Sequence, residues 1–176
     1  MMNNGPFLVP STFENASVDE HQVCGLLMPK YDRSLAIDES NISLDVIYRR
    51  AKEMETALGY MHSKSVIHMD IKPANIFIDY QGTWWLGDYG SCVTEGDSIL
   101  STTEFFYPTK IIGTPARAAY DWYMLCGVVV SKMMNGDLIH ENLDNFLRTT
   151  ITKCLHPLLK ECLETFMRRH DEVRIS

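Results

Sequence analysis

The sequence has few basic residues and no regular cysteine pattern. Against 23 acidic residues it carries 16 lysines and arginines, which gives a formal net charge of -7. Proteins that bind DNA or RNA contact the phosphates with clustered Lys and Arg, so this charge argues against a nucleic acid partner. The 5 cysteines show no C-x-x-C spacing, which favours neither a disulfide framework nor a zinc ribbon. We therefore expect an intracellular, cytoplasmic protein that binds no nucleic acid.

The sequence also shows no recognisable targeting signal and no membrane-spanning segment. Residues 1–20 show no basic region, no apolar stretch of secretory length and no small-residue cleavage site. The longest nearly uncharged apolar run, residues 124–130, is too short to cross a bilayer. We expect no signal peptide and no membrane partner. With 176 residues, 45% of them hydrophobic, and no internal repeat or linker, the chain is predicted to bury a single core.

The first part of the chain predicts a hairpin and then a helix. Residues 6–10 and 22–29 are short apolar segments that predict two strands, joined by a polar loop that includes Glu14 and Asn15. From Ser43 onward, apolar residues recur at spacings of three and four, which predicts an amphipathic helix capped by Ser43. Arg50 is expected on its solvent side. The expected buried stripe is Leu44, Ile47, Ala51, Met54, Leu58 and Met61.

The rest of the chain predicts a second small hairpin and further helices, and so an α+β fold that is mainly α-helical. Residues 76–79 and 83–87 are extended runs separated by turn residues. Residues 121–134 are apolar all round, which predicts a buried helix. Residues 144–169 also look helical. Their expected core positions are Phe146, Ile151, Leu155, Leu158, Leu159, Leu163 and Phe166.

Three polar residues, Asp70, Lys72 and Asn75, lie close together just before the second hairpin. A carboxylate can accept a proton, an ammonium can neutralise a transferring phosphate, and an amide oxygen is a hard ligand suited to Mg²⁺. Residue types in this pattern favour phosphoryl transfer. Each residue alone would be read as an ordinary turn or cap residue, so the functional interpretation depends on the whole cluster.

The segment from His68 to Asn75 resembles the catalytic loop of eukaryotic protein kinases, H-R-D-x-K-x-x-N, and matches it at His, Asp, Lys and Asn. Residues 88–90, Asp-Tyr-Gly, resemble the D-F-G magnesium motif of the same family. A lysine two positions after the aspartate is typical of Ser/Thr-specific members. Two motifs in register are more specific than either one alone.

The resemblance implies roles for four residues. Asp70 would be the catalytic base, Lys72 would contact the γ-phosphate of ATP, and Asn75 and Asp88 would hold Mg²⁺. ATP and Mg²⁺ are therefore the expected cofactors, and a protein is the expected substrate. The resemblance leaves the oligomeric state open.

Residues 24–35 resemble the fifth strand and hinge of the family. Met28 would be the gatekeeper, Pro29 would offer its carbonyl to adenine, and Tyr31 would offer its backbone N–H. Phe77 would lie beneath the adenine. These residues complete the expected nucleotide site.

The chain also departs from the family pattern. We expect a partial kinase domain over residues 5–176, in which residues 5–31 are a remnant of the small lobe with the hinge and residues 32–176 are the large lobe. No G-x-G-x-x-G occurs, so the chain alone is expected to bind ATP poorly. Met69 replaces the arginine of the loop motif, and residues 107–109 replace A-P-E without its glutamate.

Three functional hypotheses follow from these matches and departures. The first is an incomplete Ser/Thr protein kinase catalytic region, and it is favoured by the four matching residues. The second is a non-catalytic, pseudokinase-like binding module, and the lack of part of the small lobe favours it. The third is a small-molecule phosphotransferase. The hinge-like segment and Lys72 fit this hypothesis less well than they fit a protein kinase. Asp121 is expected to hold the catalytic loop by its backbone in the kinase-like cases.

Overall fold

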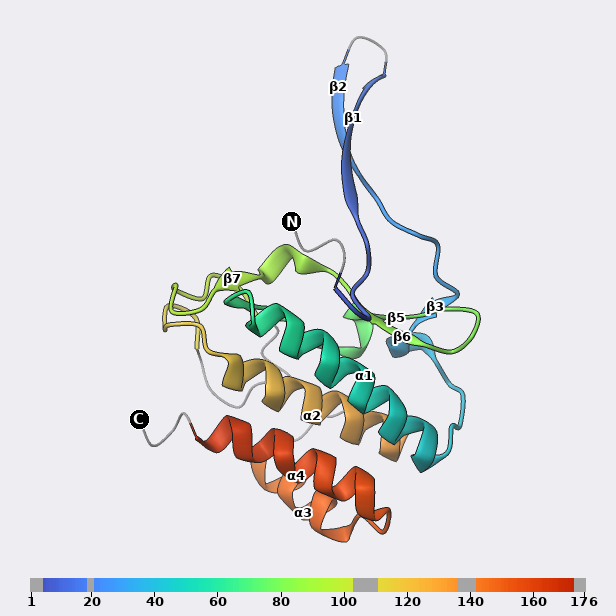
Figure 1. Cartoon of the computed structure of the whole chain (residues 1–176), viewed down its shortest axis with the longest axis vertical. Helices are drawn as coiled ribbons and strands as arrows, with labels where there is room; N and C mark the ends of the chain where they lie inside the picture. The colour runs from blue at the N-terminus through green and yellow to red at the C-terminus, as the bar shows by residue number, and fades with distance from the viewer. Residues whose placement is uncertain (1–4, 19–20, 103–110, 136–141, 173–176) are drawn as a thin grey trace.

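The computed structural model describes residues 5–18, 21–102, 111–135 and 142–172, with the backbone alone for residues 13–18 and 21–25 (Figure 1). A helical body carries a two-stranded hairpin that projects away from it (Figure 1). The helices are α1 (Leu44–His62), α2 (Ala118–Met134), α3 (Leu143–Lys153) and α4 (Pro157–Asp171). In the body, α2 lies between α1 and α4, and α3 packs beside α4 (Figure 1).

Helix α1 begins where its sequence predicted. The Ser43 side chain accepts a hydrogen bond from the Val46 amide at 3.4 Å, which satisfies one of the free amides of the first turn. The predicted stripe is buried from Ile47 onward, whereas Leu44, in the first turn, is exposed and was wrongly placed in the core. Arg50 is buried rather than exposed, and the Glu53 carboxylate, 2.7 Å from its guanidinium, offsets part of the cost of burying the charge.

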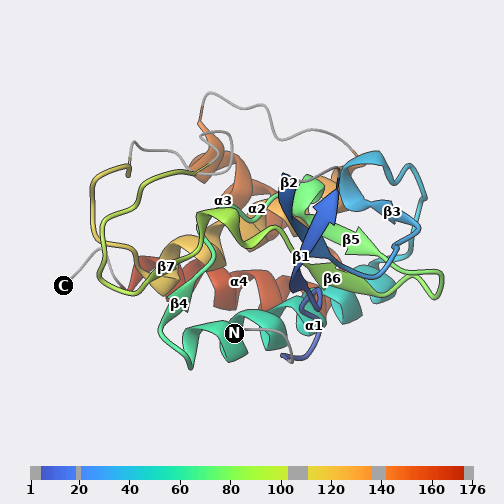
Figure 2. The same ribbon diagram turned by 90° about the horizontal axis from the view of Figure 1, so that it is seen from above.

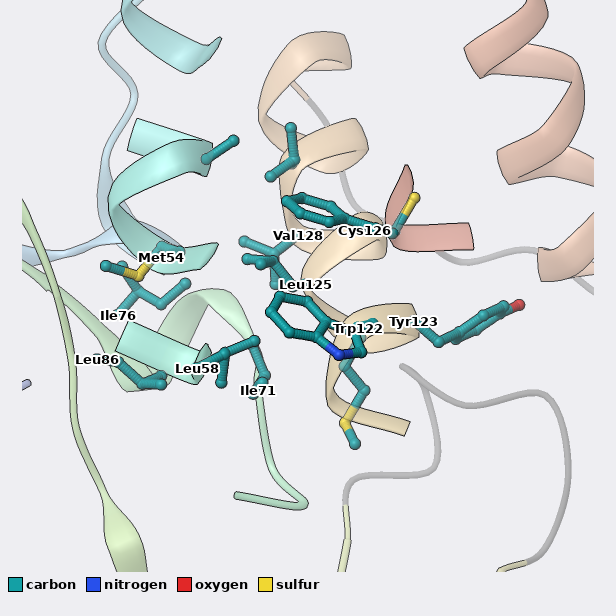
Figure 3. Packing of buried hydrophobic residues seen from close by; sticks show 14 of the residues in the cluster. Met54, Leu58, Ile71, Ile76, Leu86, Trp122, Tyr123, Leu125, Cys126 and Val128 are labelled. Atoms are coloured by element: carbon teal, nitrogen blue, oxygen red, sulfur yellow. The ribbon is translucent and has the colours of Figure 1, made fainter. Parts of the chain in front are cut away.

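Helix α2 is buried on nearly all sides, as its apolar sequence predicted, although it begins at Ala118 rather than at Asp121. Trp122 of α2 stacks on Phe166 of α4, with ring centroids 5.6 Å apart. On its other side, α2 faces Leu58 and Ile76 (Figure 3). Because α2 is packed from both sides, it is the centre of the core. Each of its fully buried large apolar side chains contributes about 1.5–3 kcal/mol to the stability of the fold.

The helical region predicted over residues 144–169 is two helices. Pro157 lacks an N–H and fits the first turn of a helix better than its interior, and it begins α4. The His156 ring caps α4, because its Nδ1 accepts from the Leu159 amide at 3.0 Å. Leu155 lies between the helices and is 93% exposed, and Leu158 is 53% exposed, so both core predictions were wrong. Ile151, Leu159, Leu163 and Phe166 are buried as expected.

The described strands form three small sheets, and Figure 2 shows β3, β5 and β6 at one end of the molecule and β4 and β7 at the other. The bounds are β1 (Thr12–Val18), β2 (His21–Leu27), β3 (Arg33–Ser34), β4 (Val66–Ile67), β5 (Ile76–Ile78), β6 (Trp84–Leu86) and β7 (Val93–Thr94). Short 3₁₀ turns lie at η1 (Leu35–Ile37), η2 (Pro73–Asn75) and η3 (Tyr89–Ser91). The predicted second hairpin is confirmed as β5 and β6, which pair antiparallel.

The first hairpin exists, but its first strand was predicted too early. Strand β1 includes Glu14 and Asn15, which were expected in the loop, and pairs antiparallel with β2. The apolar residues just before it pair with β6 instead, where the Val9 amide donates to the Leu86 carbonyl at 2.8 Å. Leu8 and Val9 are thereby buried, which a projecting hairpin would not have allowed. Among the described helices, none combines the length and apolarity needed to cross a membrane.

Candidate active site

The loop between β4 and β5 is hydrogen-bonded to the start of α2. Asp121, in the first turn of α2, accepts hydrogen bonds from the amides of His68 at 2.8 Å and Met69 at 2.9 Å. Met69 lies in the left-handed region at φ 64°, an uncommon conformation for a residue other than glycine. Its side chain is fully buried. The structure thus shows the backbone contact that was expected of Asp121.

Three of the predicted site residues meet in this loop. Lys72 Nζ lies 2.8 Å from Asp70 Oδ2, and Asn75 Nδ2 donates to the same oxygen at 2.9 Å. Asn75 Nδ2 also donates to the Asp70 backbone carbonyl at 2.8 Å, which fixes the amide group in orientation. Asp70 and Asn75 are buried, whereas Lys72 is partly exposed. Two donors therefore hold one oxygen of the Asp70 carboxylate in a defined position.

The His68 ring connects this loop to the Asp-Tyr-Gly segment. Its Nδ1 accepts from the Asp70 amide at 3.3 Å, so its Nε2 carries the hydrogen and donates to the Gly87 carbonyl at 3.0 Å. Full burial lowers the pKa of His68, although the nearby Asp121 charge opposes this shift. The ring therefore stays neutral at neutral pH and serves as a hydrogen-bonded link.

Asp88 follows β6 in a left-handed conformation at φ 58°, and its Oδ1 accepts from the Gly90 amide at 3.4 Å. The residue before it has to be small. A Cβ on Gly87 would meet the Phe77 ring at 2.8 Å and the Val9 side chain at 2.9 Å. Close packing at Gly87 thus brings Phe77 against the segment that carries Asp88.

A cleft of about 600 Å³ opens beside these residues. Four of the eight predicted site residues line it, and the other four, Asp70, Lys72, Pro29 and Tyr31, are not part of its described lining. The Tyr31 ring packs against Phe77 instead, with centroids 5.5 Å apart. The described lining is Val9, Ser11, Leu26, Met28, Ala74, Asn75, Phe77, Asp88, Tyr89 and Gly90. The backbone roles expected of Pro29 and Tyr31 stay predictions.

Lys72 faces a different space, a second cavity of about 640 Å³ between η1, η2 and the end of α2. One carboxylate oxygen of Asp70 is bonded both to Lys72, which lines this cavity, and to Asn75, which lines the first cleft. In the second cavity, buried Lys132 pairs with Asp38 at 2.9 Å. The buried carboxylate of Asp70 thus lies next to lining residues of a largely apolar cleft and of a cavity of mixed polarity.

Two residues of the site were missed from the sequence. His62, at the end of α1, places Nε2 2.8 Å from Asp121 Oδ2. Thr102 donates its hydroxyl to the Met69 carbonyl at 2.7 Å, so both polar backbone atoms of Met69 have partners. Residues 107–109, expected in place of A-P-E, lie outside the described residues.

Residues 16–172 match the family model of the protein kinase domain. The chain belongs to the protein kinase family. It is 37% identical to the serine/threonine-protein kinase Sgk2 of Homo sapiens over 93 residues, which cover 49% of this chain and 25% of that protein. It is 32% identical to Sgk3 of Rattus norvegicus over 135 residues, which cover 65% of this chain and 26% of that protein.

The kinase fold is also seen in a solved structure, that of the Cydia pomonella granulovirus kinase PK-1. The two share 17% sequence identity with a TM-score of 0.70, and the match covers 96% of this chain and 70% of that one. This likeness confirms the predicted α+β, mainly helical kinase fold. The chain spans about a quarter of the length of the curated kinases named above.

Proposed function

We propose that this chain is the catalytic region of a serine/threonine protein kinase, which transfers the γ-phosphate of ATP to a hydroxyl group of a protein. The observation that carries the proposal is the hydrogen-bonded set of Asp70, Lys72 and Asn75 at the edge of the cleft that Asp88 also lines. A turn built only for structure would not need a carboxylate buried between an ammonium and an amide.

Asp70 is the group that accepts the proton of the substrate hydroxyl. The bonds from Lys72 and Asn75 orient its carboxylate, and general bases placed in this way contribute about 10²–10⁴-fold to a rate. Lys72, with its side chain partly exposed, lies close enough to stabilise negative charge on a phosphoryl group that is in transfer. The reaction would therefore take place between the two cavities.

Asn75 and Asp88 fit a magnesium ion by their chemistry. Asn75 uses Nδ2 to bond Asp70, which leaves the hard amide oxygen Oδ1 for a cation. Asp88 adds a carboxylate on the same cleft. Mg²⁺ held there together with nucleotide phosphates would neutralise their charge.

The apolar wall of the cleft suits a purine ring. Met28 and Phe77 lie on this wall together with Val9 and Leu26. The backbone groups of Pro29 and Tyr31 would add the polar contacts to adenine that the side chains do not provide. Residues 5–31 would then be the remnant of a small lobe with its hinge, and residues 32–176 the large lobe.

The test compares this chain with a polypeptide in which it follows a small lobe that supplies a glycine-rich loop and its lysine. Transfer of ³²P from labelled ATP to protein substrates should be near background for the chain alone and clear for the joined polypeptide. Asp70→Asn should lower kcat of the joined polypeptide by at least about 100-fold. Asp97→Asn is a matched control at an exposed position and should leave kcat unchanged.

The alternative is a non-catalytic binding module. Joined polypeptides that fold, bind ATP with Mg²⁺ and still transfer no phosphate to any substrate tested would favour it. Equal rates for Asp70→Asn and the joined parent would also exclude Asp70 as the base.

A further inference from the structure

Tyr89 occupies the middle of the Asp-Tyr-Gly segment, where the family motif has phenylalanine. Its additional hydroxyl lies within hydrogen-bond distance of two backbone carbonyls. The oxygen lies 3.0 Å from the Val9 carbonyl and 2.9 Å from the Leu86 carbonyl. A phenol has one proton, so the two acceptors share it. These carbonyls belong to two different segments, the stretch before β1 and the end of β6.

The same two segments already meet through their backbones. The Val9 amide donates to the Leu86 carbonyl at 2.8 Å, and the Leu86 amide donates to the Phe7 carbonyl at 2.9 Å. The Tyr89 hydroxyl adds a side-chain bond across this junction from the residue that follows Asp88.

The segment around Asp88 needs such support. Asp88 is exposed and lies at φ 58°, a conformation that is uncommon for residues other than glycine and that local hydrogen bonds stabilise. On its amino side, His68 donates to the Gly87 carbonyl. On its carboxyl side, the Tyr89 ring packs edge-on against His68, with centroids 5.9 Å apart, and its hydroxyl reaches Val9.

We propose that Tyr89 is a positioning residue, whose hydroxyl holds Asp88 at the wall of the cleft by bonding the Val9 and Leu86 carbonyls. This role rests on the proposed function of Asp88 as a ligand of the nucleotide-bound metal ion. Both acceptors are contained within this chain. The hydroxyl therefore provides an anchor for the metal-binding segment that phenylalanine at the same position would lack.

The test uses the full chain with Tyr89→Phe, which removes one oxygen atom, and Tyr80→Phe, a matched change at an exposed tyrosine. Hydrogen exchange of the amides of residues 86–92 should become about three- to tenfold faster in Tyr89→Phe, as for the loss of one hydrogen bond, and stay unchanged in Tyr80→Phe. Binding of Mn²⁺ with ATP is measured on the joined polypeptide, which has a complete nucleotide site, from the paramagnetic broadening of ATP resonances well below the unfolding temperature. It should weaken by a similar factor in Tyr89→Phe only.

Asp88→Asn separates failure of this inference from failure of the proposed function. If Asp88→Asn weakens Mn²⁺–ATP binding and Tyr89→Phe changes neither exchange nor binding, the positioning role is wrong and the metal site stands. Faster exchange with unchanged Mn²⁺–ATP affinity also overturns the role, because the hydroxyl would then be only structural. If the joined parent binds Mn²⁺–ATP and its Asp88→Asn variant binds it equally well, the proposed metal site is wrong, and the role of Tyr89 fails with it.

Discussion

Among single residues, Asp121 bonds the loop between β4 and β5 at two consecutive amides. Its carboxylate is fully buried, accepts from the amides of His68 and Met69, and lies 2.8 Å from His62 Nε2. Met69 depends on this contact, because its left-handed backbone is unfavourable for a residue with a side chain. The same contacts therefore stabilise the fold and position the residue next to Asp70.

Asp121→Asn should lower the free energy of unfolding by roughly 2–4 kcal/mol, measured by urea denaturation. Asparagine has the same shape but one acceptor oxygen, so at least one of the two buried amides would face an NH₂ group. Asp144→Asn is a matched control, because Asp144 pairs with Arg148 on the surface and should cost less than about 1 kcal/mol. Similar losses in the two variants would contradict the role given to Asp121.

The sequence was sufficient to predict residues that act within one loop. Asp70 and Asn75 are close in sequence, and their types and spacing already predicted one cluster; their hydrogen bonds show that the two side chains meet. His62 and Thr102 could not be found in this way, because their partners in the loop and in α2 lie far along the chain. No periodicity or local motif encodes such contacts, which exist only once the helices have packed.

Among the elements, the start of α1 was predicted from local chemistry, whereas the start of α4 and the pairing of the stretch before β1 were not. Ser43 marks the start of α1 because its side chain caps the first turn. Pro157 carried a similar signal for the start of α4, but the apolar pattern on both sides concealed it. The stretch before β1 was read as a strand of the hairpin, because an apolar run shows that a segment is buried but not which neighbour covers it.

The contact between η1 and α2 leads to a prediction about acid stability. Lys132 Nζ donates to the carboxylate of Asp38 and to the carbonyls of Asp38 and Ser40 at 2.7–2.9 Å. Burial alone would raise the pKa of Asp38, but hydrogen bonds from Lys132, Ser40 and Arg33 outweigh it and lower the pKa from 3.8 to about 2. A lowered carboxyl pKa stabilises the fold above pH 4, and this contribution is lost as the pH falls toward 2.

Lys132→Met should therefore destabilise the protein most at neutral pH. We expect a loss of roughly 3 kcal/mol in the free energy of unfolding at pH 7, and a loss smaller by about 1 kcal/mol at pH 3, measured by urea denaturation at both pH values. Lys153→Met, at an exposed lysine in the last turn of α3, serves as the control and should show neither effect. A loss in Lys132→Met that does not change with pH would show that Asp38 is not the partner that matters.

In the whole molecule, the hairpin and the helical body differ in how they are supported. Strands β1 and β2 pair only with each other among the described strands, and they project from the body (Figure 1). Leu26 and Leu27 are neighbours on β2 and are 53% and 52% exposed. Successive residues of a strand point to opposite faces, so both faces of the hairpin present apolar surface to solvent near its base. The core of α2, by contrast, is covered from both sides (Figure 3).

This difference predicts unequal stability within one chain. An isolated two-stranded hairpin is marginally stable in water, whereas a helix buried on all sides opens only when the whole body unfolds. In native-state hydrogen exchange, the amides of β1 should exchange at least about 100-fold faster than those of the middle of α2, and α4 should behave like α2. Joining the chain to a small lobe should slow exchange in β1 and leave α2 unchanged. Protection of β1 equal to that of α2 in the chain alone would show that the hairpin is stabilised by the helical body and needs no further strands.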